Sequence, residues 1–180
     1  MKKLLPVLTC LALTACGGGS DSSDTAPVKV EPQAKTERNV AAKLNGATII
    51  ASFDSAGAEY VIDGDNGEST YWSANETGDN FRIDFGEVVS LSAITIYTND
   101  LSFSTANPSK IVEVSKDGTS WMSTSNIVGG DIPCLNSTTG SGKMFCEFAA
   151  SEDIQFLRVT ITAETNPELI KIYEINATGV

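Results

Sequence analysis

Apolar and polar residues alternate in short runs over most of the chain beyond Arg38, and turn-forming residues separate these runs. In the clearest run, Phe81, Ile83 and Phe85 share one face of a strand and the charged residues between them share the other. Similar runs predict strands over 47–52, 91–97, 110–115, 144–148, 156–163 and 169–175. No stretch has the spacing of a long amphipathic helix. Runs of strands without intervening helices favour an all-β fold, an antiparallel sandwich.

A tight hairpin is predicted between two of these runs, where Asp117 and Gly118 lie between Val114 and Trp121. Glycine adopts the positive φ that such a turn requires, because it has no Cβ.

The first 15 residues have the composition of a secretory signal. Two lysines precede an apolar stretch over 4–14, which is too short to cross a membrane as a helix. The segment 13–16, Leu-Thr-Ala-Cys, resembles the lipobox of bacterial lipoproteins. This resemblance implies a signal peptide over 1–15 and a lipid on Cys16, and Gly17 implies release to the outer membrane of a Gram-negative bacterium, on its periplasmic or surface face. A generic secretory signal with an incidental thiol at Cys16 is the alternative.

A flexible linker is predicted after the lipidated cysteine, over 16–38. This segment is rich in glycine, serine, aspartate and proline and has no apolar periodicity. Fully extended, its residues reach roughly 70 Å, far enough to hold a domain away from a membrane surface. The folded domain is therefore expected over 39–180.

Charge and composition exclude several classes of function. The chain of 180 residues has a formal net charge of −11 and no histidine. An acidic chain has no surface to neutralise phosphates, so a nucleic-acid partner is not expected. Without histidine, Ser-His-Asp and Cys-His catalysis and histidine-ligated metals are excluded. An enzyme would have to use carboxylates alone; the available ones are Asp63, Asp65, Asp84 and Asp100.

Seven short segments, taken in order, together resemble the discoidin family, also called coagulation factor five/eight C-terminal-type domains, and its relatives among galactose-binding-like carbohydrate-binding modules. They are NVA at 39–41, IDGD at 62–65, TYWS at 70–73, FRIDFG at 81–86, VSKDGTSW at 114–121, LRVTI at 157–161 and IYEI at 172–175. The resemblance covers 39–180. It implies a jelly-roll β-sandwich with neighbouring termini, a non-catalytic role and ligand-binding loops at one end. It also implies that Trp72 and Trp121 are buried.

The acidic loop over 63–70, Asp-Gly-Asp-Asn-Gly-Glu-Ser-Thr, is the clearest candidate for a metal site. Crowded oxygen ligands in a glycine-containing loop suit calcium, although the spacing is not that of an EF-hand. In calcium-binding members of the discoidin family the ion is held by such a loop and by a glutamate near the C-terminus. The resemblance implies the ligands Asp63, Asp65, Ser69 or Thr70, and Glu174. The alternative is a polar turn whose carboxylates face water.

The chain has four cysteines, of which Cys10 leaves with the signal peptide and Cys16 receives lipid. Cys134 and Cys146 then remain as a pair in an oxidising compartment, which predicts a disulfide between them. The alternative, a metal-binding or redox-active thiol pair, lacks Cys-x-x-Cys spacing.

Three loops are candidates for binding a ligand: 53–59, 99–108 and 128–143. Related carbohydrate modules commonly grip the sugar with a histidine or arginine, an asparagine and an aromatic residue. Here histidine is absent and the 99–108 loop has no arginine. Amides, carboxylates and an exposed ring remain to contact sugar hydroxyls and the apolar face of a sugar; they are Asn99, Asp100, Phe103, Asn107, Asn136 and Lys143.

Three hypotheses for the function follow. The first is a membrane-anchored binding module for a carbohydrate or another envelope or extracellular ligand. The second is a structural subunit that docks an envelope protein and binds no glycan. The third, a carboxylate-based hydrolase, is the least favoured because members of the family are non-catalytic.

Overall fold

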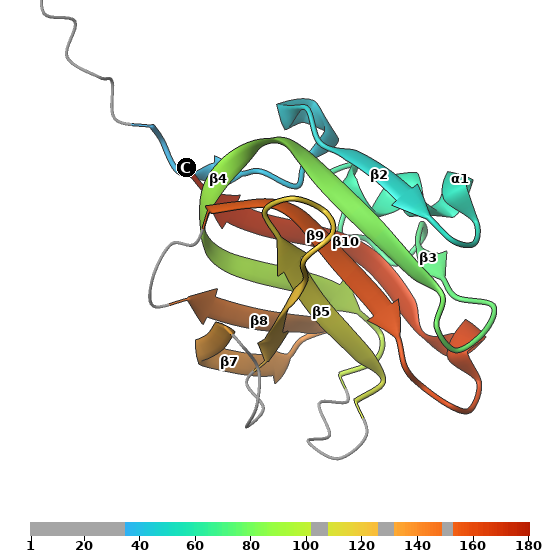
Figure 1. Ribbon diagram of the computed structural model, residues 1–180. Coiled ribbons are helices and arrows are strands. Elements are labelled where there is room, and N and C mark those ends of the chain that lie inside the picture. The colour runs from blue at the N-terminus through green and yellow to red at the C-terminus, as the bar shows by residue number, and fades with distance from the viewer. Residues whose placement is uncertain (1–34, 102–107, 126–131, 149–152) are drawn as a thin grey trace, which may run out of the picture. The chain divides into compact units, whose positions relative to one another are not determined.

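The computed structural model describes residues 35–101, 108–125, 132–148 and 153–180. Two β-sheets pack face to face in this part of the chain (Figure 1). Sheet B contains β2 (Thr48–Ala51), the first half of β4 (Asn80–Thr98), β9 (Asp153–Ile161), β5 (Lys110–Ser115) and β6 (Met122–Ser125), in this spatial order. Sheet A contains β1 (Arg38–Asn39), β10 (Lys171–Gly179), the second half of β4, β8 (Lys143–Phe148) and β7 (Ile132–Gly140), while β3 (Trp72–Ser73) also pairs with β10. The predicted all-β sandwich is confirmed.

Strand β4 belongs to both sheets. It pairs with β2 and β9 as far as Ser90, and with β10 and β8 from Leu91 onward. Between these halves Gly86 has a φ of +77°, and the strand curls from one sheet to the other (Figure 1). Alternate side chains of a strand point to opposite faces. The apolar set therefore fills the space between the sheets, as the burial of Phe81, Ile83, Phe85, Val89, Leu91, Ile94 and Ile96 shows.

The predicted strands over 81–85 and 91–97 are thus a single strand. The predicted strand over 169–175 is partly wrong, since residues Pro167–Leu169 form the 3-10 helix η3 and β10 begins at Lys171. The prediction of a loop over 128–143 is also wrong in part, because β7 lies within this range. Most residues of β7 are small or polar, so the strand has no alternation of apolar and polar residues from which it could be predicted. Backbone pairing with β8 defines it instead.

The predicted hairpin joins β5 to β6, but it is longer than the tight turn expected, because β5 ends at Ser115 and β6 begins only at Met122. Val114 lies opposite Met122, and Gly118 has a φ of +72°. The carboxylate of Asp117 accepts hydrogen bonds from the backbone N–H groups of Thr119 and Ser120, at 2.8 and 2.7 Å, which closes the turn.

The two tryptophans differ in burial. Trp72 is fully buried, and its ring lies edge-on to Phe81 at a centroid distance of 4.9 Å. Trp121 is only partly buried, so the expectation that it lies in the core is wrong. Arg158 lies over the Trp121 ring instead, with its guanidinium carbon 4.1 Å from the ring centroid.

Helices are short in the described part of the chain. They are η1 (Lys43–Asn45), α1 (Ser55–Ala58), η2 (Glu59–Ile62) and η3. Among the described residues, no helix has the length and apolar character needed to cross a membrane.

The two ends of the described domain lie side by side. Arg38 lies opposite Gly179, and Asn39 lies opposite Thr178. The side-chain Oδ1 of Asn39 accepts hydrogen bonds from the backbone N–H groups of Ala41 and Ala177, at 3.1 and 2.9 Å. The asparagine thereby joins the first strand to the last, which leaves the opposite end of the sandwich to the long loops.

Candidate functional site

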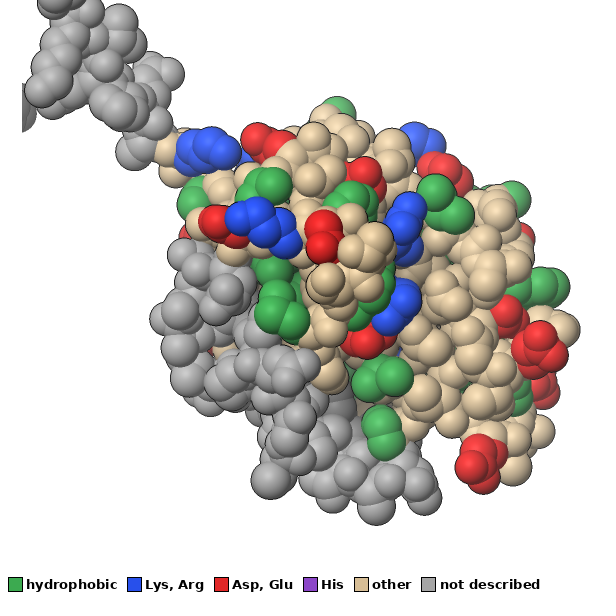
Figure 2. All heavy atoms as spheres, viewed as in Figure 1, with side chains coloured by type: hydrophobic (Ala, Val, Ile, Leu, Met, Phe, Trp, Pro, Cys, Tyr) green, Lys and Arg blue, Asp and Glu red, His purple; other side chains and the backbone are tan. Residues whose placement is uncertain are grey.

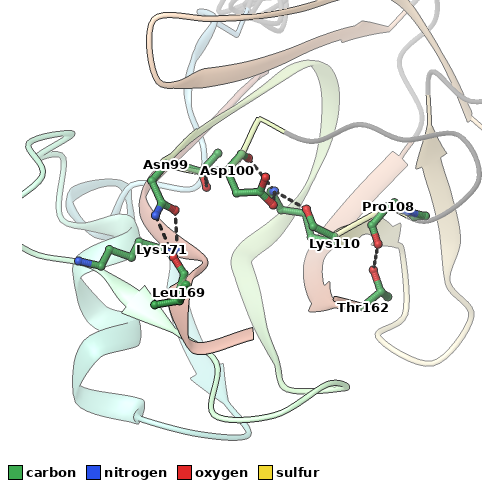
Figure 3. A network of polar contacts seen from close by, with 9 residues as sticks. Asn99, Asp100, Pro108, Lys110, Thr162, Leu169 and Lys171 are labelled. Carbon is green, nitrogen blue, oxygen red and sulfur yellow. Dashed lines mark hydrogen bonds and ion pairs between the residues drawn. The ribbon is translucent and has the colours of Figure 1, made fainter. Parts of the chain in front are cut away.

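A continuous series of hydrogen bonds brings the loops at the open end of the sandwich together. The backbone N–H of Ile161, at the end of β9, donates to Asp79 just before β4 at 2.9 Å. The next residue, Thr162, donates its N–H to Ser109 before β5 at 2.8 Å, and its hydroxyl to the carbonyl of Pro108 (Figure 3). Segments far apart in the sequence therefore form one surface at the end of the domain away from its termini.

Asp79 holds the first part of this end in place. Its Oδ1 accepts a hydrogen bond from the Ser52 hydroxyl at 2.7 Å, and its Oδ2 accepts from the backbone N–H groups of Asn75 and Glu76 at 2.9 and 3.1 Å. Burial works against the ionised carboxyl, but these hydrogen bonds outweigh it and lower the pKa of Asp79. The residue joins the end of β2 to the loop before β4.

Asn99, a predicted ligand residue, is used for internal contacts. Its amide nitrogen donates to the carbonyl of Leu169 at 2.8 Å, and its amide oxygen accepts from the backbone N–H of Lys171 at 2.8 Å (Figure 3). Both ends of the amide are therefore bound to the segment that leads into β10. Asn99 positions the 99–108 loop against β10.

Asp100 pairs with a buried cation. The Lys110 side chain is fully buried, and its ammonium lies 3.1 Å from the Asp100 carboxylate (Figure 3). It also donates to the Asp100 carbonyl at 2.8 Å and to the Ser109 hydroxyl at 3.0 Å. Burial lowers the pKa of Lys110, and the negative charge of Asp100 opposes that change. The pair fixes both ends of the same loop.

The structure describes only some of the other predicted ligand residues. Phe103 and Asn107 lie outside the described residues. The backbone of Asn136 is part of β7, opposite Glu147, but its side chain is outside the described part of the structure. Lys143 begins β8 opposite Tyr97, with an exposed side chain, and the nearby Gly142 carbonyl accepts a hydrogen bond from Thr98 at 2.9 Å. Lys143 therefore does reach the loop end.

The 53–59 loop is held by two contacts that sequence patterns did not reveal. The Trp72 indole N–H donates to the carbonyl of Phe53 at 2.8 Å. The Asp54 carboxylate accepts from the N–H of Gly57 at 3.0 Å and caps α1. A Cβ on residue 57 would lie only 2.1 Å from Asp54 Oδ2, so this cap requires glycine. The Phe53 side chain remains 43% exposed.

The sequence patterns also did not predict a cluster of Lys171, Tyr71 and Tyr173 at the start of β10. The Lys171 ammonium lies over the Tyr71 ring, 4.1 Å from its centroid. Tyr71 and Tyr173 meet edge to face at 6.4 Å. These contacts depend on the pairing of β3 with β10, which the short length of β3 hides from periodicity analysis.

Glu174 and Thr70 stand out among the predicted calcium ligands. Glu174 is 1% exposed, and its Oε2 accepts a hydrogen bond from the Gly64 N–H at 3.3 Å. Its Oε1 and the Thr70 hydroxyl are buried without a hydrogen-bond partner. A buried oxygen without a partner is costly, and a cation or an ordered water removes that cost. These two atoms fit the donor chemistry that a calcium ion needs.

Asp63 and Asp65 lie on the exposed side of the same loop. Asp63 Oδ1 accepts from the Asp65 N–H, and Asp65 Oδ1 accepts from the Gly67 N–H, both at 2.8 Å. Burial raises the pKa of Glu174 to about 8; the Gly64 N–H opposes this rise, and the charges of Asp63 and Asp65 add to it.

The protein's other predicted donor, Ser69, is exposed. No three His, Cys, Asp or Glu side chains in the described ranges converge as a metal-holding group. A calcium ion here would therefore depend on hydroxyl and backbone carbonyl oxygens in addition to Glu174.

The predicted disulfide falls partly outside the described side chains. Cys146 in β8 is disulfide-bonded. The side chain of Cys134 in β7 is not among those described, so the pairing of these two residues stays a prediction.

Comparison with known proteins gives consistent results at the level of the fold. A sequence model of the F5/8 type C domain matches residues 45–175. No curated protein sequence is significantly similar to the chain.

Several solved structures are similar. The CpGH89CBM32-6 module of Clostridium perfringens shares 20% identity and a TM-score of 0.58, over 79% of this chain and 99% of its own. CpGH89CBM32-4 of the same organism, in complex with glcNAc-alpha-1,4-galactose, has 16% identity and a TM-score of 0.57 over 83% of this chain and 99% of its own. Chitosan-binding module 1 of the chitosanase/glucanase from Paenibacillus sp. IK-5 has 24% identity and a TM-score of 0.51, over 77% of this chain and 97% of its own.

The buried pair in the 99–108 loop generates a stability prediction. We expect Asp100→Asn to lower the free energy of unfolding by about 2–3 kcal/mol at neutral pH, because Lys110 would remain buried without its counter-charge. The lowered pKa of Lys110 means that the unfolded state binds more protons, so the loss should shrink as the pH rises into the alkaline range. Urea unfolding at several pH values measures both effects.

Asp153→Asn is the matched control. Asp153 pairs with Lys116 on the surface, where both side chains are more than 60% exposed. We expect a loss below about 0.5 kcal/mol there. Equal stability of the two variants would contradict the positioning role of Asp100.

Proposed function

The chain belongs to the F5/8 type C domain family, and from this membership we propose that it is a non-catalytic module that binds carbohydrate through the loops opposite its termini. The observation that carries the proposal is the gathering of loop segments distant in sequence into one surface, joined by the hydrogen bonds and ion pair of Asp79, Asn99 and the Lys110–Asp100 pair. A rigid base under variable loops is the arrangement from which ligand sites are commonly built.

The chemistry of that surface also supports a sugar ligand. Phe53 and Leu169 expose apolar side chains there, and Lys143 exposes a cation. Sugars present apolar ring faces bordered by hydroxyl groups, so a mixture of apolar and polar side chains suits them. Asn99 and Asp100 act as positioning residues in this proposal, which leaves Phe103, Asn107, Asn136 and Lys143 from the original set as contacts. The fold neighbours include modules whose ligands are glcNAc-alpha-1,4-galactose and chitosan.

A hydrolase is a poorer explanation of the carboxylates. Asp84 accepts hydrogen bonds from Gly86 N–H and Gln155 at 2.8 and 3.1 Å, and Asp100 pairs with Lys110. Asp63 and Asp65 close turns within their own loop. Each of the four groups accepts hydrogen bonds or pairs with a cation within the fold, and the four lie at three separate places, since only Asp63 and Asp65 share a loop. General acid and base catalysis needs two carboxylates aimed at one bond.

Glycan binding tests the proposal. We expect the domain over 39–180 to bind members of a glycan array, with glcNAc-alpha-1,4-galactose and chitosan oligosaccharides as the first defined probes for calorimetry. Phe53→Ala and Phe103→Ala should each weaken binding by about tenfold, because loss of a ring removes stacking against the sugar.

Val88→Ala is the control for these variants. Val88 is 40% exposed on the curl of β4, close to the termini, so its loss should leave binding unchanged. A blank array, together with affinity capture of one envelope protein by the wild-type domain, would instead support the alternative of a structural, protein-docking subunit.

We propose further that calcium binds beside Glu174 and Thr70, with Asp63, Asp65 and Ser69 in the adjoining loop. The ion would supply positive charge to two buried oxygens and tie the loop over 63–70 to β10. Its role there is structural, since the site lies within the fold and not among the loops proposed for sugar binding.

Thermal unfolding with and without calcium tests this site. At millimolar calcium we expect the wild-type melting temperature to rise by about 5 °C relative to chelator, because the ion binds only the folded state. Glu174→Gln should abolish the shift. Glu87→Gln, an exposed residue paired with Lys35 and Arg38, should retain it. An equal shift in the Glu174 variant would place the ion elsewhere.

Membrane attachment is the remaining part of the proposal. The lipobox at 13–16 supports a lipid anchor on Cys16 and an outer-membrane location. In detergent phase partition of the protein expressed in a Gram-negative host, the wild type should enter the detergent phase and Cys16→Ser the aqueous phase. Cys10→Ser should behave as the wild type, because residue 10 leaves with the signal peptide. Detergent partition of the Cys16 variant would contradict lipidation.

A further inference from the structure

Two arginines face each other on the outer surface of sheet B. Arg82 in β4 lies directly opposite Arg158 in β9. Like charges directly opposite on neighbouring strands destabilise a sheet. In a chain with a net charge of −11 and only 12 basic residues, this placement of two cations side by side calls for an explanation.

The two arginines have unequal partners. Arg158 donates from Nε to Glu113 at 2.9 Å, pairs with the same carboxylate through a second nitrogen at 2.7 Å, and covers the Trp121 ring. Arg82 lies 5.4 Å from the centroid of the Phe156 ring. Within the described residues its guanidinium forms no ion pair or side-chain hydrogen bond, while Asp84, two residues further along the same face, accepts hydrogen bonds from Gly86 and Gln155. The donors of the Arg82 guanidinium are therefore not bonded to a carboxylate of the described chain.

A hollow of about 340 Å³ opens over this row of residues. Its walls include Ile50, Asn80, Arg82, Gly118, Trp121 and Arg158. Ile50 is 63% exposed. Figure 2, which views the molecule from the side of sheet B, shows basic side chains beside hydrophobic ones in the middle of this face. A volume of this size is at the lower end of the range for small-molecule sites.

We propose that this hollow binds a saccharide that carries a carboxylate, such as a uronic acid residue. The planar guanidinium of Arg82 can donate two parallel hydrogen bonds to a carboxylate. Ile50 and Trp121 provide apolar wall for the ring of the sugar, and the Asn80 side chain adds an amide. The site lies mainly on the face of sheet B, and at one edge it adjoins the loop end, because Ser52 lines the hollow and also bonds Asp79. It does not depend on the loop-end proposal, because the two sites are tested with different ligands.

The overall acidity of the chain limits the choice of ligand. At physiological ionic strength charges are screened over about 8 Å, so a single carboxylate in the hollow interacts with the charges that lie close to it, which are Arg82 and the Arg158–Glu113 pair. A polyanion such as a nucleic acid extends beyond that distance and meets the acidic surroundings. One acidic sugar is therefore a better match than a charged polymer of phosphates.

The two tryptophans allow a direct test by NMR. The probes are methyl β-D-glucuronide and methyl β-D-glucoside, which differ only in the carboxylate. We expect the glucuronide to bind roughly tenfold or more tightly than the glucoside, because its carboxylate forms charge-assisted hydrogen bonds. Binding should move the indole N–H signal of Trp121, which lines the hollow, and leave that of Trp72, which is bonded to Phe53 near the loop end. Acetate alone should bind weakly, since it lacks the sugar ring.

Arg82→Gln separates a ligand-binding role from a structural one. This variant should reduce the affinity for the glucuronide by about tenfold to the level of the glucoside. Its thermal stability should equal or exceed that of the wild type, because Arg158 loses a like-charged neighbour. Lys43→Gln removes the same charge at an exposed pair with Glu59 and should leave binding unchanged.

Three results would overturn the proposal. They are equal affinity for the two glycosides, unchanged glucuronide binding by the Arg82 variant, and a shift of the Trp72 signal without one of Trp121. Failure here is distinguishable from failure of the loop-end proposal, because the latter is measured with neutral glycans and the Phe53 and Phe103 variants.

Discussion

The sandwich depends on one strand that contributes to both of its sheets. β4 pairs with β2 and β9 in its first half and with β10 and β8 in its second, and its apolar side chains fill the core on both sides of the curl at Gly86. Because each half must keep its apolar face inward, the register of four other strands is set by this one. The curl also returns β4 to the end from which it started, so both of its ends join the loop surface (Figure 1).

Polar contacts at that end divide the loop residues into two kinds. Asp79 and the Lys110–Asp100 pair are buried or partly buried, and Asn99 is exposed, but all of them bond to groups of neighbouring segments. Phe53, Leu169 and Lys143 direct theirs outward. Amide and carboxylate side chains serve equally well for binding sugar hydroxyls and for holding loops, so residue type alone does not separate these roles.

Two places in the fold hold groups whose usual partners are missing, and both are candidates for ligands. Glu174 and Thr70 bury oxygens without a hydrogen-bond partner, and Arg82 lies opposite another arginine while its own guanidinium is bonded to no carboxylate of the described residues. Such arrangements cost stability, and folded proteins retain them where a bound group removes the cost. The two places require ligands of opposite charge: a cation suits Glu174 and Thr70, and an anion suits Arg82. One ligand therefore cannot serve both places.

The sequence by itself determined the all-β class, most of the central strands, the Asp117–Gly118 turn and the family, because alternation and turn chemistry are local properties of the chain. The resemblance to the family also named Asp63, Asp65, Ser69 or Thr70, and Glu174 as candidate calcium ligands, and the structure shows that Glu174 and Thr70 bury oxygens without a hydrogen-bond partner. Only the tertiary structure decided that 81–85 and 91–97 form one strand, that β7 exists and that Trp121 lies at the surface. It alone assigned Asn99 and Asp100 to internal contacts and placed Arg82 against Arg158. These outcomes depend on cross-strand register and on contacts between distant segments, which local patterns do not encode.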